Sequence, residues 1–125
     1  MPTDPEHRLD ELMETPDPGF ETVMSCVFGI EPHETRTYLV LLERPGSTIG
    51  ELETPLERDR STINRSLTTL YERGIVRRDR RLLDGGGYVY QYTAIALPEV
   101  KRMLHDALDA WTATVHGVID DFDEE

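Results

Sequence analysis

The sequence predicts a mostly helical domain with one small β-hairpin, an α+β fold that ends in a long helix. Three observations predict it. Short apolar segments with helical spacing are separated by proline and glycine, three consecutive glycines at Gly85–Gly87 join two strand-like segments, and an apolar stripe with a helical period runs along the last quarter of the chain. A chain of 125 residues is the size of one domain.

The N-terminal elements are two helices that follow an acidic arm. Residues 1–19 are rich in proline and acids, and we expect a flexible arm with one helical turn at about residues 7–13. Phe20–Phe28 is a short apolar helix that ends at Gly29. Pro32 suits the first turn of the next helix, which should stop before Pro45.

Two further helices carry recognisable caps. Ser47 or Thr48 is the expected N-cap of a helix from Ile49 to about Leu56, and Asp59 is the expected N-cap of a helix from Arg60 to about Arg73. Gly74 then lies where a left-handed C-terminal glycine is favoured.

The C-terminal third predicts a hairpin and one long helix. Strands are expected at Ile75–Leu83 and Tyr88–Ile95, and Pro98 suits the first turn of a helix over residues 97–122, followed by an acidic tail at 123–125. The stripe on this helix is too broad to be left in water, which predicts a dimerisation helix. Its members are Val100, Leu104, Ala107, Trp111, Val115, Val118 and Phe122.

The order of these elements is that of a winged helix-turn-helix with a long C-terminal dimerisation helix. We expect residues 20–96 to form a DNA-binding domain and residues 97–122 to form the pairing helix.

The charge distribution supports nucleic acid as a partner despite a net charge of −12. The segment from Arg58 to Arg81 holds eight arginines and three acids, a surplus of five positive charges, whereas the rest of the chain has five bases and twenty-two acids. One basic segment in an acidic protein is the expected footprint of double-stranded DNA.

The helix that begins at Arg60 is the predicted recognition helix. Ile63, Leu67 and Leu70 share its inner face, while hydroxyl side chains and arginine occupy the opposite one. Small hydroxyl residues permit close approach to a groove, and arginine can pair with guanine. A merely solvated face is the weaker alternative, because Ser and Thr are mediocre helix formers. The predicted DNA-contacting residues are Arg58, Arg60, Ser61, Thr62, Asn64, Arg65, Thr68 and Thr69.

The hairpin is the predicted wing. Arginines fall on both faces of its first strand, so one set reaches the phosphates whichever face is turned to DNA. The predicted contacts are Arg77, Arg78, Arg80, Arg81, Gly85, Gly86 and Gly87. Tyr88, Tyr90 and Tyr92 share one strand face, and we expect them to pack on the domain rather than stack on bases.

Other site types are not indicated. No nucleophile–base pair, phosphate loop or metal-ligand spacing occurs, so we expect no enzyme activity and no cofactor. The histidines are too scattered to form a metal site, and Cys26 lies among apolar residues, which predicts a buried core thiol rather than a redox sensor. One cysteine and no apolar run of spanning length or signal peptide predict a cytoplasmic protein with no membrane contact.

The use of arginine in place of lysine, together with the excess of acids, indicates a high-salt cytoplasm. Lys101 is the only lysine beside twelve arginines, and acids outnumber bases almost two to one. At molar salt the repulsion among these carboxylates is screened, and bound cations are expected partners. We expect a halophilic protein whose DNA affinity falls only slightly as salt is added, or even rises.

The residues also resemble a known family. The stretch from FGIEPHETRTYLVLLERPG through RSTINRSL to LYERGIV is similar to the winged-helix domain of archaeal TrmB-type regulators, and more broadly to the PadR and MarR classes. The GGGYVYQY hairpin resembles small one-domain versions from haloarchaea. The resemblance implies DNA contact at Arg60, Ser61, Thr62, Asn64, Arg65 and the wing arginines. No sugar-binding domain follows in this sequence, so sugar sensing is not implied.

The sequence thus predicts a homodimeric, sequence-specific transcription regulator, a repressor on a pseudo-palindromic operator, whose small-molecule effector is unknown. Two alternatives stay open: a nucleoid-type protein that binds DNA without sequence preference, and a winged helix that binds only other proteins.

Overall fold

A computed structural model describes residues 19–123. All of the expected arm (residues 1–19) except Gly19 lies outside the described residues, as do the last two residues of the acidic tail. In chain order the elements are α2 (Phe20–Phe28), α3 (Pro32–Glu43), α4 (Ile49–Leu56), α5 (Arg60–Glu72), β1 (Val76–Leu82), β2 (Tyr88–Ala94) and α6 (Leu97–Asp121). This is the predicted winged helix-turn-helix, with element ends that agree with the expectations or differ from them by one residue.

The local caps explain where the helices begin and end. Thr48, rather than Ser47, caps α4, and its hydroxyl accepts a hydrogen bond from the Glu51 backbone at 3.2 Å. Gly74 follows α5 with φ 78°, and the backbone N–H groups of Gly74 and Ile75 donate to the carbonyls of Tyr71 and Leu70. That pair of bonds closes the helix and turns the chain into β1.

Helix α3 lies at the centre of the core. Tyr38 and Leu41 are fully buried, and α3 packs against α2, α4, α5 and β2. The core is completed by apolar side chains from every other element, among them Met24, Leu52, Ile63, Leu67, Leu70, Tyr92, Val100 and Leu104.

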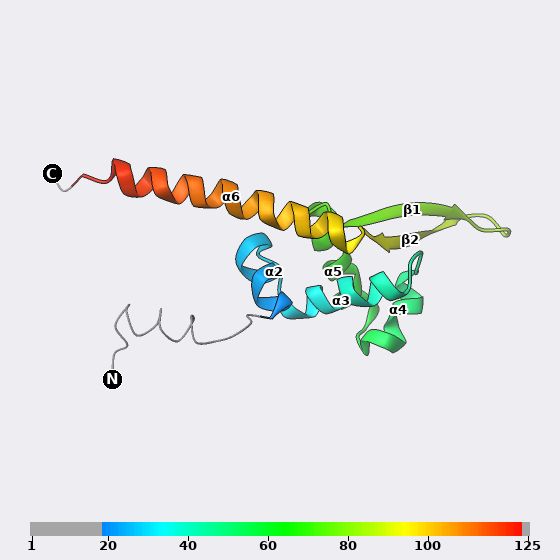
Figure 1. The fold of residues 1–125 in the computed structure, drawn as a ribbon. Coiled ribbons are helices and arrows are strands. Elements are labelled where there is room, and N and C mark those ends of the chain that lie inside the picture. Colours follow the sequence, from blue (N-terminus) through cyan, green and yellow to red (C-terminus); the bar gives the residue numbers. More distant parts are fainter. Residues whose placement is uncertain (1–18, 124–125) are drawn as a thin grey trace, which may run out of the picture.

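The wing is a two-stranded antiparallel hairpin in which Val76 pairs with Ala94 and Leu82 with Tyr88. The turn between α3 and α4 adds a short bridge from Ser47 to Tyr92, which supports the second strand from its outer edge. This bridge holds the hairpin near the core, and the rest of the hairpin projects away from the domain, as Figure 1 shows.

Helix α6 leaves the body of the domain after its first turns. Val100 and Leu104 are buried in the core and α2 packs beside this part, whereas the C-terminal half extends past α2 (Figure 1). Trp111, Val118 and Phe122 are each at least 65% exposed in the single chain. The predicted stripe is thus divided into a part used by the domain's own core and a part that is uncovered.

Two hydrogen bonds at Ile95 fix the direction in which α6 leaves the core. The Tyr38 hydroxyl donates to the carbonyl of Ile95 at 2.7 Å, and the Ile95 N–H donates to Ile75 at 2.9 Å. Both bonds hold the short connection between β2 and α6. Burial raises the pKa of Tyr38 to about 12, because a charged phenolate would lose its hydration.

Tyr38 should make stability sensitive to alkaline pH. Its folded pKa of about 12 lies above the unfolded value of 10.0, so the stabilisation is complete below pH 10 and is lost as the pH rises through 12. We expect Tyr38→Phe to lower the free energy of unfolding at pH 8 by about 1 kcal/mol, since the Ile95 carbonyl loses its donor. In urea titrations from pH 8 to pH 11, the difference between the two proteins should narrow above pH 10; parallel profiles would contradict the assignment.

Candidate nucleic-acid interface

The orientation of α5 is fixed by its cap and its buried face. The Thr62 backbone N–H donates to Asp59 Oδ1 at 2.9 Å, and hydrogen bonds from the Thr62 side chain and backbone lower the pKa of the Asp59 carboxyl. Ile63, Leu67 and Leu70 are at most 1% exposed. With this face held inward, the opposite face must point to solvent.

The outward face carries much of the predicted recognition set. Ser61, Asn64, Arg65 and Thr68 are exposed, while Thr62 and Thr69 lie half-buried on one flank. The Thr68 hydroxyl donates to the Asn64 carbonyl at 2.8 Å, which leaves its oxygen able to accept. The face is thus lined with small polar groups around one arginine.

The arginines around α5 differ in whether a carboxylate pairs with them. Arg60 Nε lies 3.2 Å from Glu53 Oε1, so α4 neutralises part of its charge. Arg65 and Arg58 have no ion pair or hydrogen bond to any residue between 19 and 123. Arg65, near the centre of the exposed face, is therefore the base best placed to meet a nucleic acid.

The wing arginines fall on two faces, as predicted. The register puts Arg78 and Arg80 on the same face as Tyr88, Tyr90 and Tyr92, and puts Arg77 and Arg81 on the other. Arg77 Nε lies 3.5 Å from Asp79 Oδ2, and both side chains are exposed. An exposed pair of this kind is weak and can be exchanged for a phosphate contact.

Arg78 joins the wing to α5. Its guanidinium carbon lies 4.6 Å from the centre of the Tyr71 ring and 4.4 Å from that of Tyr90. Each such contact is worth about 0.5–1 kcal/mol at an exposed site. The sequence did not predict this role, because only the hairpin register and the path of α5 bring Tyr71 and Tyr90 to the same arginine.

The tyrosines follow the predicted packing to different degrees. Tyr92 is buried, which raises its pKa, and Tyr90 is half-buried, so packing on the domain is confirmed for these two. Tyr88 is 49% exposed near the wing tip, where the Arg80 guanidinium carbon lies 4.8 Å from its ring centre. Exposure therefore increases outward along the strand.

The wing tip is sterically open. Gly86 and Gly87 have φ values of 93° and 79°, and a Cβ at any of the three glycines would meet no atom within 4 Å. Among residues 19–123, no atom would obstruct a close approach of this backbone to a groove.

A groove between α4, α5 and the wing was not predicted. It has a volume of about 250 Å³, and Thr48, Gly50, Arg60, Asn64 and Tyr90 line it. A Cβ at Gly50 would come within 3.0 Å of Arg60 Nη2, so glycine leaves room for that side chain. The N-terminus of α4, with its backbone N–H groups, opens beside this groove.

The prediction of a buried Cys26 is wrong. Cys26 is exposed on α2, because Met24 takes the buried position of that helix while Val23 and Val27 lie partly covered. Cys26 and Val27 border a small apolar depression with Leu108 and Trp111 of α6. The periodicity of a nine-residue helix was too short to distinguish these faces.

Within the described range, no three side chains of metal-ligating type gather in one place. The described helices also include none that combines the length and the apolar character needed to cross a membrane.

Comparison with known proteins identifies the family. The sequence profile described as "Sugar-specific transcriptional regulator TrmB" matches residues 24–97, which include the whole helix-turn-helix and wing. The chain belongs to the TrmB family. It is a family of transcriptional regulators, in agreement with the resemblance given above.

Relatives of this TrmB-family chain include the uncharacterized protein MJ1503 of Methanocaldococcus jannaschii. The two are 30% identical over 106 residues, which cover 85% of this chain and 80% of MJ1503. A second protein of that organism, MJ1082, is 34% identical over 95 residues, covering 76% of this chain and 78% of MJ1082.

Solved structures share the fold of this TrmB-family chain. A "possible transcriptional regulator" from Methanosarcina mazei Go1 superposes with a TM-score of 0.74 at 24% identity, covering 83% of this chain and 88% of that one. A MarR protein from Peptoclostridium difficile gives 0.54 at 14% identity, covering 94% and 71%. At these identities the likeness establishes the winged-helix fold.

Proposed function

We propose that the protein is a sequence-specific DNA-binding transcription repressor that acts as a homodimer. Residues 20–96 form the DNA-binding domain, and residues 97–122 form the pairing helix. The observation that carries the proposal is the outward face of α5: Ser61, Asn64 and Thr68 surround Arg65, whose guanidinium makes no ion pair or hydrogen bond within residues 19–123.

In this proposal α5 enters the major groove. Thirteen residues at about 1.5 Å each give a helix long enough to follow the groove across several base pairs. Arg65 contacts base edges, the small polar residues allow close approach, and Arg58 and Arg60 contact phosphates at the N-terminal end of α5.

The wing supports the same docking. Arg77 and Arg81 contact the phosphate backbone, and the open glycine tip approaches the minor groove. Because Arg78 bridges Tyr71 and Tyr90, the wing keeps a fixed position relative to α5. We therefore propose that the main role of Arg78 is to position the wing. It contacts DNA only through N–H donors that do not face the Tyr71 and Tyr90 rings.

A second copy of the chain covers the exposed part of α6. The uncovered stripe is continuous with apolar side chains of α2, since Phe20, Val23 and Val27 border a depression with Leu108. Pairing of two such surfaces would bury the side chains that a single chain leaves in water. Two recognition helices would then face half-sites about one turn of DNA apart, and occupancy of such an operator blocks transcription.

Arg65→Gln should weaken specific DNA binding by roughly 5- to 150-fold, which corresponds to about 1–3 kcal/mol. Arg102→Gln is the matched control, because it removes the same charge on α6, where Arg102 pairs with Glu99 at 3.1 Å. Fluorescence anisotropy on DNA fragments recovered by genome-wide mapping measures both variants. Equal affinity for mapped and random DNA would contradict the proposal and favour the nucleoid-type alternative.

Trp111→Asp should convert the dimer into a monomer, because a charge would be placed in the apolar pairing surface. Ala113→Asp adds the same charge roughly 200° around the helix and should leave the dimer intact. Sedimentation in molar KCl measures both. A monomeric wild-type protein would exclude this pairing model.

We also propose that the protein works at high salt. With a net charge of −12, the midpoint of thermal unfolding should fall as KCl is reduced from about 2 M to 0.1 M, where the Debye length is roughly 10 Å. Sucrose added to the low-salt sample tests whether screening or solute exclusion is responsible. An unfolding midpoint that does not change with KCl would refute the halophilic assignment.

A further inference from the structure

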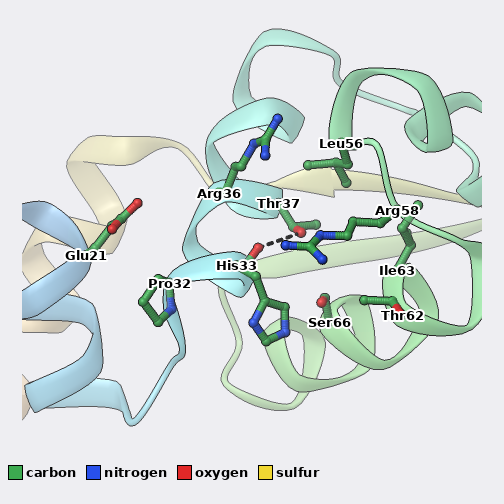
Figure 2. Close-up of a pocket in the computed structure, with 10 residues that line it drawn as sticks. All are labelled: Glu21, Pro32, His33, Arg36, Thr37, Leu56, Arg58, Thr62, Ile63 and Ser66. Carbon is green, nitrogen blue, oxygen red and sulfur yellow. Dashed lines mark hydrogen bonds between the residues drawn. The ribbon is translucent and has the colours of Figure 1, made fainter.

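A polar hollow lies on the flank of α5 that faces away from the wing. It has a volume of about 350 Å³ and is bordered by α2, α3, the turn before α5 and α5 itself (Figure 2). That volume is within the range of small-ligand sites. The sequence analysis did not predict a hollow at this place.

The walls of this hollow are positively charged. Arg58 reaches across it from the turn before α5 toward Thr37 on α3 (Figure 2), and its guanidinium makes no ion pair or hydrogen bond with the described part of the chain. Arg36 lies at the rim, where its Nη2 donates to the Pro55 carbonyl at 3.3 Å. Glu21 is the one acid among the lining residues, although acids dominate the rest of the surface.

Ser66 supplies an independent indication of a ligand. The residue is 2% exposed, and its hydroxyl has no hydrogen bond to any of residues 19–123. Figure 2 shows this hydroxyl directed into the hollow beside Thr62. Because no described residue accepts the proton of this hydroxyl, a group that enters the hollow can accept a hydrogen bond from it.

The remaining wall is apolar. Pro32, Leu56 and Ile63 line the hollow between the polar groups. This combination favours an anion that carries an apolar part over an inorganic ion, because the apolar part would cover these side chains.

We propose that the hollow binds a small organic carboxylate. The carboxylate accepts hydrogen bonds from the Arg58 guanidinium and the Ser66 hydroxyl, Arg36 adds positive charge at the rim, and the apolar part lies on Leu56 and Ile63. The source is a free solute rather than a DNA phosphate, because Ser66 is too deeply buried for a group held on a duplex backbone to reach.

The site would couple the carboxylate to DNA binding. Arg58 is shared: the proposed DNA interface uses it at the N-terminal end of α5, and a bound carboxylate would hold it over the hollow. Occupancy by one ligand therefore disfavours the other, and the effect is reciprocal. This coupling rests on the proposed function, whereas binding of the carboxylate does not.

Benzoate is a suitable probe, with inorganic phosphate as the anion that lacks an apolar part. At constant KCl, we expect saturable benzoate binding by isothermal titration calorimetry, weaker binding of phosphate, and a drop in DNA affinity of roughly 5- to 150-fold at saturating benzoate. Absence of saturable benzoate binding, or phosphate binding as tight as benzoate binding, would overturn the proposal.

Ser66→Ala separates the hollow from the DNA interface. It should weaken benzoate binding at least about tenfold and abolish the effect of benzoate on DNA, while DNA affinity without benzoate stays within about twofold of the wild-type value. Ser25→Ala, at an exposed serine of α2, is the matched control and should behave as wild type. Thermal unfolding of both variants verifies that they are folded.

Arg58→Gln completes the design, since it should weaken both benzoate and DNA. If Ser66→Ala binds benzoate as tightly as the wild type, the site is refuted. If the wild type binds benzoate but no DNA, the proposed function fails while the carboxylate site stands, so the two failures are distinguishable.

Discussion

The burial of one face of α5 against α3 is the constraint on which the rest of the structure depends. Ile63, Leu67 and Leu70 leave water together, and each fully buried side chain of this kind contributes about 1.5–3 kcal/mol. Rotation of α5 about its axis would expose them, so the helix has one stable orientation. Every polar residue on the other side is therefore presented outward in a fixed direction, and the exposed hydroxyl-and-arginine face follows from the apolar one.

The two flanks of α5 are built for different purposes. On the flank facing the wing, Tyr71 contacts Arg78 and a groove opens beside α4, which joins the helix and the hairpin into one surface. On the opposite flank, Thr62 and Ser66 border the arginine-lined hollow. A single helix thus carries a central face that is proposed to contact DNA, one flank that contacts the wing, and one flank that is proposed to take a carboxylate.

Charge and burial act at different distances in this protein. The acid surplus is spread over the surface, where salt screens it, whereas the arginines near α5 act through short contacts with rings, carboxylates or an incoming ligand. For the uncovered half of α6, exposed apolar surface is important rather than charge. The packing of one chain leaves Trp111 and Phe122 exposed, and we propose that a second protomer covers them.

The sequence by itself determined the element order, the caps at Asp59 and Gly74, the cap of α4 as Ser47 or Thr48, and the inner face of α5, because each depends on residues within one or two turns of each other. The tertiary structure decided what depends on distant segments: the contacts of Arg78 with Tyr71 and Tyr90, the exposure of Cys26, the division of the α6 stripe, and the hollow at Ser66. Periodicity predicts which face of a helix is apolar, but only the packed chain shows which neighbour covers that face and which part is left open.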